Sequence, residues 1–157
     1  ATTLQGIDRA SKRLEGLVAG LLDFAKIELG ELRLISRPFS TYRTLEDVKD
    51  TFVHEAREKN LMLHVDRSEA LPEWVLGDSV RLTQILCNLV GNAIKFTQEG
   101  EITLKAETDE HERIAFTIKD TGIGIPKDAL PRIFVRFSRG RCVRICFWFR
   151  ISDPETG

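Results

Sequence analysis

The spacing of apolar residues changes along this chain between the period of a helix and the period of a strand, and this order constrains the fold more than any other feature. Apolar positions recur every three or four residues within 44–56, whereas Leu61, Leu63 and Val65 recur at every second residue. The same change separates a helical stretch at 78–97 from two alternating stretches at 102–106 and 114–118, which predict a hairpin. Helices interspersed with the strands of one sheet predict an α+β fold with two layers.

Polar residues and a glycine mark the expected ends of the two helices. Thr44 with Asp47 has the form of a capping box before the first helix. We expect Asp78 to cap the second helix, because its carboxylate can accept a hydrogen bond from a backbone N–H of the first turn. Glu99 and Gly100 follow the last apolar position and predict the end of that helix.

The first 30 residues carry an apolar seam with the spacing of a coiled coil. A single helix cannot bury such a seam, and the chain offers no second helix of this length and period. We therefore expect the partner to be upstream sequence or a second subunit. Gly30 should end the helix and Pro38 should force extended chain, which places a boundary near residue 36. The seam consists of Leu4, Ile7, Ser11, Leu14, Val18, Leu21 and Ala25.

Composition argues against several classes of protein. The chain has 157 residues, 42% of them apolar, and a formal net charge of −1, so one globular domain with an appendage is expected and nucleic acid is not. The three cysteines do not have the spacing of a disulfide framework, and the sequence shows neither a secretory leader nor an apolar run long enough to span a membrane. We therefore expect a reducing, cytoplasmic setting, which is compatible with a full-length parent that is anchored in a membrane. Cys142 and Cys146 could bind a metal, but without a second ligand pair we interpret them as small apolar side chains.

The helix expected at 78–97 has one polar face that needs an explanation. At about 100° per residue, Asn88, Asn92 and Lys95 share a narrow face with Arg81 and Gln84. The face could simply be solvated. Asparagine is a poor helix former, however, and an amide oxygen suits Mg²⁺ while a lysine suits phosphate. The arc expected to pack on the sheet contains Leu82, Ile85, Leu86, Leu89, Ala93 and Phe96.

A second polar motif, DTGIGIP at 120–126, directly follows the last predicted strand. Gly122 and Gly124 allow backbone conformations and close ligand approach that side chains would block. Asp120 presents a carboxylate that can accept a hydrogen bond from an amino group. A glycine turn capped by an aspartate would also explain this motif alone. The order of asparagine-bearing helix, hairpin and aspartate-glycine turn is more specific than either part.

At these residues the sequence resembles the ATP-binding domain of sensor histidine kinases. This domain has the Bergerat-type fold that gyrase-like ATPases, mismatch-repair ATPases and heat-shock chaperones share. NLVGNAIKFT at 88–97 resembles the asparagine box of the family, DTGIGI at 120–125 its first glycine box, and IFVRF at 133–137 its phenylalanine box. LLDFAKIELGELRL at 21–34 resembles the end of the second dimerisation helix and its linker.

The resemblance implies ATP and Mg²⁺ as ligands and a role for individual residues. Asn92 would hold the Mg²⁺ that bridges the phosphates, and Asn88 would support that end of the site. Lys95 would contact phosphate, and Asp120 would bind the adenine amino group. The glycines would border the adenine and a mobile lid. The remaining ATP-binding residues that the resemblance implies are Gly122, Gly124, Ile125, Phe134 and Phe137.

The residue one turn before the magnesium asparagine separates two activities of the superfamily. Members that hydrolyse ATP carry a glutamate there as general base, whereas this chain has Asn88, whose amide cannot accept a proton at neutral pH. We therefore expect a histidine kinase region that presents Mg-ATP to a histidine nucleophile. The alternatives are a Bergerat-type ATP hydrolase and a non-catalytic dimerisation or interaction fragment with a remnant nucleotide site.

No histidine of the chain has the sequence context of the phospho-acceptor. The acceptor histidine should be followed by an acidic residue and, a few positions on, by a proline. Glu55 follows His54 but no proline does, and His64 and His111 do not fit either. The acceptor is therefore expected on an upstream helix, and this chain alone should be inactive. The expected partners are that helix, the receiver domain of a response regulator, and a second copy bound through residues 1–30.

The C-terminal segment departs from the family pattern, because no second glycine box follows Gly140. We expect a dimerisation helix and linker at 1–36, an incomplete ATP-binding domain at 37–140 and an atypical tail at 141–157. A nucleic-acid or membrane-surface patch is one interpretation of the tail, and a truncation or altered reading frame is the preferred one. The arginines of 129–152, which contains no acidic residue, are Arg132, Arg136, Arg139, Arg141, Arg144 and Arg150.

Overall fold

The computed structural model describes residues 2–122, 143–147 and 150–151. The chain divides into two compact units, Ala1–Leu34 and Ile35–Gly157. Each unit is described by itself below.

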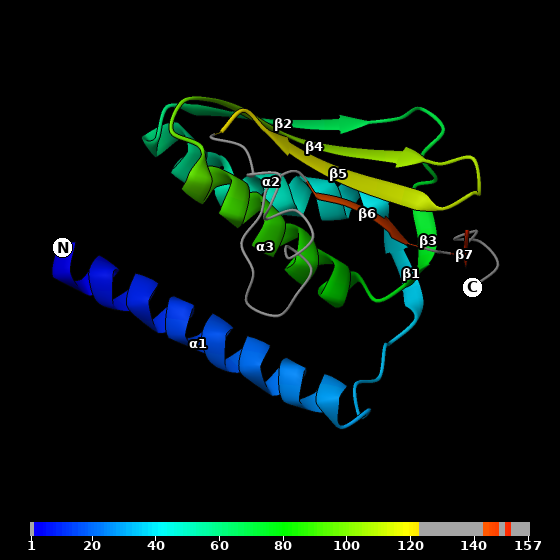
Figure 1. The fold of residues 1–157 in the computed structure, drawn as a ribbon, viewed down its shortest axis with the longest axis horizontal. Helices are drawn as coiled ribbons and strands as arrows, with labels where there is room; N and C mark the ends of the chain where they lie inside the picture. The colour runs from blue at the N-terminus through cyan, green and yellow to red at the C-terminus, as the bar shows by residue number, and fades with distance from the viewer. Residues whose placement is uncertain (1, 123–142, 148–149, 152–157) are drawn as a thin grey trace, which may run out of the picture. The chain divides into compact units, whose positions relative to one another are not determined.

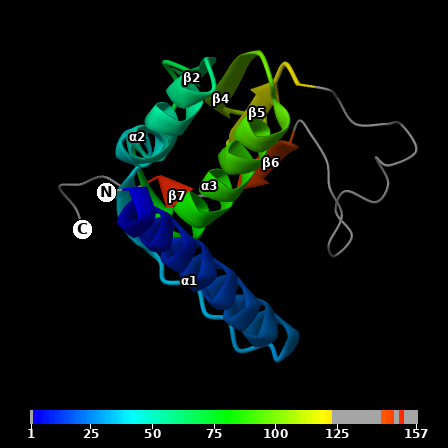
Figure 2. The ribbon, with the colours of Figure 1, turned by 90° about the vertical axis from the view of Figure 1, so that its left-hand side faces the viewer.

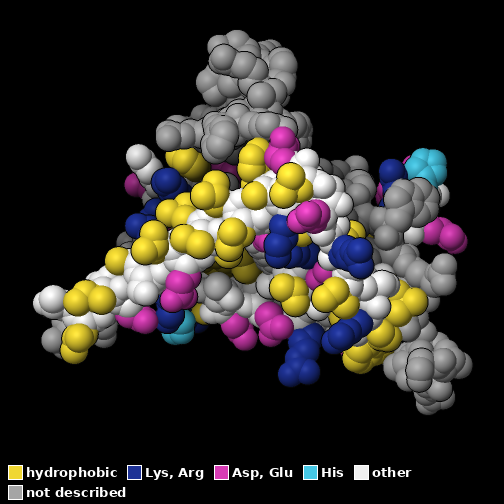
Figure 3. All heavy atoms as spheres, turned by 90° about the horizontal axis from the view of Figure 1, so that it is seen from below, with side chains coloured by type: hydrophobic (Ala, Val, Ile, Leu, Met, Phe, Trp, Pro, Cys, Tyr) yellow, Lys and Arg dark blue, Asp and Glu magenta, His cyan; other side chains and the backbone are white. Residues whose placement is uncertain are grey.

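The first unit contains one long helix, α1 (Thr2–Glu28). It ends as predicted at Gly30, which has a φ of 68° and donates its N–H to Ile27 O at 3.1 Å. In the described part of the chain no helix has both the length and the apolarity of a membrane span. Figure 3 shows apolar side chains in a row on the surface of α1. The exposed apolar residues of this helix include Leu4, Ile7, Leu14, Leu17, Val18, Leu21 and Leu22.

The second unit begins with a short strand, β1 (Arg37–Ser40), that leads directly into α2 (Thr41–Glu58). The N-cap of α2 is Ser40, whose extended backbone lets its hydroxyl accept a hydrogen bond from Arg43 N at 3.2 Å. The predicted capping box at Thr44 and Asp47 is therefore wrong. Thr44 lies inside the first turn, and its hydroxyl donates to Ser40 O at 3.0 Å instead.

The larger sheet has the strand order β2-β4-β5-β6. Strand β2 (Leu61–Arg67) runs parallel to β4 (Gly100–Thr108), which forms the predicted antiparallel hairpin with β5 (Ile114–Asp120). Strand β6 (Val143–Phe147) pairs antiparallel with β5. The buried residues of β4 occupy every second position, as the pattern predicted. They are Ile102, Leu104 and Ala106.

A smaller antiparallel sheet has the order β1-β3-β7. Strand β3 (Trp74–Gly77) pairs with β1 and with β7 (Arg150–Ile151). The sequence patterns did not predict β3, because four residues that follow Pro72 and Glu73 are too short to show a period. Strands β6 and β7 both come from the segment that we expected to be an atypical tail.

Helices α2 and α3 (Ser79–Phe96) form the second layer. Figures 1 and 2 show them side by side on one face of the larger sheet. The core lies between the two layers, and its largest fully buried side chains include Phe116 of β5, Leu45 of α2 and Ile94 of α3. The predicted two-layer α+β fold is confirmed.

The buried face of α3 lies farther from its polar face than the sequence predicted. The fully buried residues Leu82, Leu86 and Ala93 were expected, whereas Ile85, Leu89 and Phe96 are only half-buried. The cause is α2, which packs on the far side of α3: a Cβ added to Gly91 would be in ordinary van der Waals contact, 3.4 Å, with the ring of Phe52 on α2. This contact buries two residues that the prediction omitted, Val90 and Ile94.

Replacing Ser40 by alanine should lower the free energy of unfolding by about 1 kcal/mol, because α2 loses its N-cap acceptor. The exposed Asp47 is the matched control, and Asp47→Ala should change the same quantity by less than about 0.5 kcal/mol. Both values come from urea unfolding. A larger loss for Asp47→Ala than for Ser40→Ala would restore the capping box that the sequence suggested.

Candidate functional site

The N-terminal end of α3 is held by Asp78, the N-cap that the sequence predicted. Its Oδ1 accepts a hydrogen bond from Arg81 N at 3.1 Å, and its Oδ2 accepts one from Ile35 N at 3.0 Å. These N–H groups, with that of Ile35 as the largest cause, lower the pKa of the carboxyl from its ordinary value. One carboxylate thus joins the start of the helix to the start of the second unit.

The polar face of α3 carries the predicted residues. Asn88, Asn92 and Lys95 are all exposed. Arg81 and Gln84 are half-buried, and Arg81 NH1 donates to Gln84 Oε1 at 3.1 Å. Within the described residues, no hydrogen bond engages the side-chain amide of Asn88 or Asn92. Two amides and an ammonium group are therefore presented to solvent on one side of the helix.

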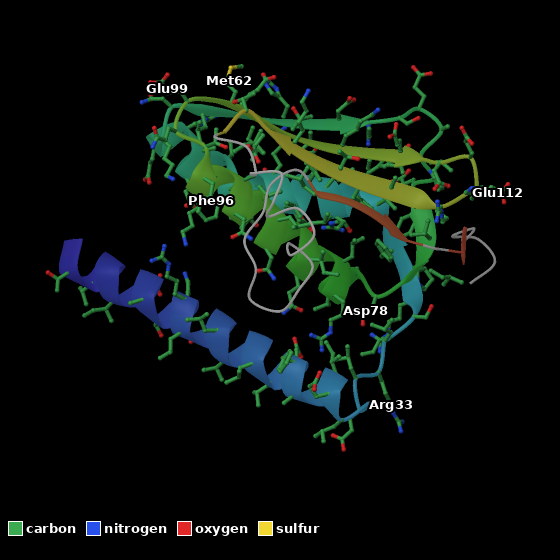
Figure 4. The ribbon with its side chains drawn as sticks, viewed as in Figure 1. Arg33, Met62, Asp78, Phe96, Glu99 and Glu112 are labelled. Atoms are coloured by element: carbon green, nitrogen blue, oxygen red, sulfur yellow. The ribbon has the colours of Figure 1, made fainter. Side chains whose placement is uncertain are left out.

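The C-terminal end of α3 is held from a different part of the chain. Lys59, just beyond α2, donates from Nζ to Ile94 O at 3.0 Å. A cation at this position satisfies a terminal carbonyl and favours the negative end of the helix dipole. The backbone becomes extended at Thr97, with φ −104° and ψ 124°. Figure 4 labels Asp78 and Phe96 at the two ends of the helix.

The aspartate of the second motif lies at the end of β5 and is half-buried. Asp120 Oδ1 accepts a hydrogen bond from Gly122 N at 2.8 Å. The residue between them, Thr121, fastens this turn to the start of β4: its hydroxyl accepts from Glu101 N at 3.0 Å, and its own N–H donates to Glu101 O at 3.2 Å. Gly100 is needed there, because it has a φ of 107° and a Cβ would collide with the hydroxyl of Thr121.

Gly122 brings the two predicted motifs into contact. A Cβ on this glycine would lie 2.8 Å from Phe96 O, 3.0 Å from Thr97 Oγ1 and 2.8 Å from the carboxylate of Asp120. The end of the asparagine-bearing helix and the aspartate-glycine turn are thus in van der Waals contact, although 24 positions separate Phe96 from Asp120. Figure 4 shows this end of the unit, near Phe96 and Glu99, opposite the turn that carries Glu112.

The structure places five of the predicted site residues. Asn88, Asn92 and Lys95 share one face of α3, and Asp120 and Gly122 adjoin its C-terminal end. The other four predicted residues lie outside the described part of the chain; they are Gly124, Ile125, Phe134 and Phe137.

Sequence reasoning missed three residues that position this site. Thr121 could have been found, because a threonine between the aspartate and the glycine of a tight turn has a hydroxyl beside free backbone groups. Thr97 was quoted within the first motif without a role. Lys59 gave no signal, since only the packing of α2 on α3 brings it to Ile94.

Comparison with known proteins assigns this arrangement to a family. Residues 77–145, which include α3 and the Asp120 turn, match the sequence model of the histidine kinase-, DNA gyrase B- and HSP90-like ATPases. The signal transduction histidine-protein kinase BarA of Escherichia coli strain K12 is 40% identical over 138 residues, which cover 85% of this chain. Residues 77–145 belong to this ATPase family. The chain is homologous to histidine kinases and spans 15% of the length of BarA.

Solved structures of histidine kinases share the fold. Full-length ShkA, in complex with AMPPNP, superposes with a TM-score of 0.74 and 35% identity, over 82% of this chain and 28% of ShkA. ThkA, in complex with the response regulator protein TrrA, superposes with a TM-score of 0.65 and 26% identity, over 85% of this chain and 38% of that one. The expected resemblance to histidine kinase ATP-binding domains is confirmed.

Replacing Gly122 by alanine should lower the free energy of unfolding by about 1–3 kcal/mol, because three oxygen atoms lie where the new methyl group would stand. Gly91 of α3 is the matched control. Its Cβ would meet the Phe52 ring at ordinary contact distance, so Gly91→Ala should leave stability unchanged or raise it by up to about 1 kcal/mol. Urea unfolding measures both. Equal effects of the two substitutions would contradict the close contact at Gly122.

Proposed function

We propose that this chain is the ATP-presenting region of a two-component sensor histidine kinase. It holds Mg-ATP for transfer of a phosphoryl group to a histidine outside the chain, from which the group passes to a response regulator. The observation that supports this most is the contact at Gly122, which sets an aspartate beside a helix face that carries two amides and a lysine. The group that we assign to the base thus adjoins the C-terminal end of the helix that carries the groups we assign to the phosphates.

Asp120 recognises the adenine base. One of its oxygens already accepts the N–H of Gly122, so the carboxylate is oriented by the turn before any ligand binds. The other oxygen accepts a hydrogen bond from the amino group of adenine. A base that presents a carbonyl oxygen at that position, as guanine does, repels the carboxylate. By the family resemblance, we assign Gly122 and Gly124 to the border of the adenine and Ile125 to ATP binding.

The exposed face of α3 binds the phosphates. Lys95 supplies a point charge, and the amide oxygen of Asn92 is a hard ligand of the kind that Mg²⁺ prefers. The described residues contain no group of three or more histidine, cysteine or acidic side chains that could hold a metal. The donor set therefore fits an ion that takes its other ligands from phosphate oxygens and water, with Asn88 supporting the same end. Bound there, Mg²⁺ neutralises negative charge on the phosphates.

The chemistry of this face favours transfer to another group over hydrolysis. Asn88 stands where a general base would be needed to activate water, and its amide cannot accept a proton. The chain instead positions the triphosphate and leaves the nucleophile to an upstream phospho-acceptor helix. ThkA, whose structure is a complex with the response regulator TrrA, supports a receiver domain as the final partner.

The exposed seam of α1 supports a homodimer through residues 1–30. In this proposal 1–36 is the second dimerisation helix with its linker, 37–140 the ATP-binding domain, and 141–157 an atypical tail. By the family resemblance, we assign Phe134 and Phe137 to ATP binding. ATP as substrate and the free thiol of Cys87 agree with a cytoplasmic location. The isolated chain lacks an acceptor histidine and transfers no phosphoryl group by itself.

Removing the carboxylate of Asp120 should weaken ATP binding by about ten- to a hundredfold, the effect of a hydrogen bond to a charged group. GTP should bind the unmodified chain far more weakly than ATP. Asp66→Ala, which removes the same charge from an exposed position on β2, is the matched control and should bind ATP normally. Calorimetric titration of the unmodified chain, Asp120→Ala and Asp66→Ala measures the affinities. Equal affinity of the unmodified chain for ATP and GTP would reject the role of Asp120.

Asn92→Ala should abolish the gain in ATP affinity that Mg²⁺ confers and leave the fold at least as stable. Alanine is the better helix former and Asn92 is exposed, so no packing is lost. Thermal unfolding and ATP titration with and without Mg²⁺ test this. A variant that unfolds several degrees lower while keeping its magnesium dependence would identify Asn92 as a structural residue.

A further inference from the structure

Thr97 is a buried polar residue with an unused hydroxyl. It is 1% exposed, and within the described part of the chain its Oγ1 is the buried side-chain atom that lacks a hydrogen-bond partner. Burying a hydroxyl in this way lowers the stability of the folded chain. Because such groups are rare in folded proteins, this one calls for a functional explanation.

The hydroxyl lies beside the carboxylate that we assign to the adenine base. Thr97 Oγ1 is 3.0 Å and Asp120 Oδ1 2.8 Å from the point where a Cβ on Gly122 would stand, and Phe96 O is also 2.8 Å from that point. The absence of a side chain at Gly122 thus allows the three oxygens to converge. A carboxylate and a carbonyl can only accept hydrogen bonds, so the proton of the Thr97 hydroxyl is the one that this group of oxygens can donate.

Of the two acceptors near the Thr97 hydroxyl, the Asp120 carboxylate is stronger than Phe96 O. Its Oδ1 accepts one hydrogen bond, from Gly122 N at 2.8 Å, and a carboxylate oxygen has capacity for a second. A bond from a hydroxyl to a carboxylate is charge-assisted and about twice as strong as one to a neutral group. Both oxygens lie within 3.0 Å of the position of the missing Cβ of Gly122, so the hydroxyl and the carboxylate adjoin the same turn.

We propose that Thr97 is a positioning residue for Asp120: its hydroxyl donates to Asp120 Oδ1 when an adenine nucleotide is bound, and this holds Oδ2 toward the amino group of the base. The inference rests on the proposed function of Asp120. The hydroxyl then gains a partner in the complex that it lacks in the free protein. The hydroxyl therefore contributes to the affinity for the nucleotide and not to the stability of the free protein.

An isosteric substitution at Thr97 can therefore separate the effect on ATP affinity from the effect on thermal stability. Thr97→Val replaces the hydroxyl by a methyl group and keeps the shape of the side chain. The free protein should unfold at the same temperature or a higher one, since a buried unpaired hydroxyl is removed. ATP affinity should fall about three- to tenfold, the range for losing one net hydrogen bond. Thr97→Ser retains the hydroxyl and should bind ATP within about twofold of the unmodified chain.

The experiment compares the unmodified 157-residue chain with Thr97→Val, Thr97→Ser and Thr83→Val. Thr83 is a half-buried threonine elsewhere on α3, and its substitution controls for a general effect of valine in this helix. Calorimetric titration with Mg-ATP gives the affinities, and thermal unfolding without nucleotide gives the stabilities. Weak ATP binding by Thr97→Val alone, with unchanged stability and rescue by serine, supports the proposal.

Three results would overturn it. The first is normal ATP affinity of Thr97→Val, and the second is an equal loss in Thr97→Ser, which would mean that shape and not the hydroxyl matters. The third is a marked loss of thermal stability in Thr97→Val, which would mean that the hydroxyl is already bonded in the free protein. If the unmodified chain itself binds no ATP, the proposed function fails together with this inference. Binding by the unmodified chain with normal binding by Thr97→Val rejects the role of Thr97 alone.

Discussion

The candidate site depends on one close contact, in which Gly122 packs against the last residues of α3. Only a residue without a side chain can stand there, because three oxygen atoms surround the position of its missing Cβ. The contact sets the Asp120 carboxylate beside the end of the helix whose exposed face carries Asn88 and Asn92. The proposed arrangement of base-binding and phosphate-binding groups therefore depends on this contact.

Other interactions hold the two partners of this contact in place. Asp78 and Lys59 satisfy backbone groups at opposite ends of α3, and both bonds come from a charged side chain. Thr121 joins the turn to β4 on its other side. The helix and the turn are therefore each fixed to the sheet or to a neighbouring helix, so a ligand could meet donors and acceptors that are already oriented. Such preorganisation is what a site needs when positioning is its main task.

The pattern of apolar residues was sufficient for the class of fold and for most of its elements. The hairpin of β4 and β5, the strand β2 and both ends of α3 follow from spacing and from capping residues such as Asp78. Strand β3 did not follow, since four residues show no period. The N-cap of α2 was misplaced because Thr44 and Asp47 have the spacing of a capping box in the sequence. In the structure β1 ends at Ser40, so the helix begins at Thr41.

By itself the sequence determined the amphipathic helix with its amides and lysine, the aspartate-glycine turn, and the family resemblance that these motifs carry. These are local properties of spacing and residue chemistry. The tertiary structure decided which sides of α3 are buried, since α2 and the sheet together select Val90 and Ile94. It alone brought Lys59 to Ile94 O and set the Thr97 hydroxyl and the Asp120 carboxylate around Gly122, because these contacts depend on how distant segments pack, and no spacing along the chain records that.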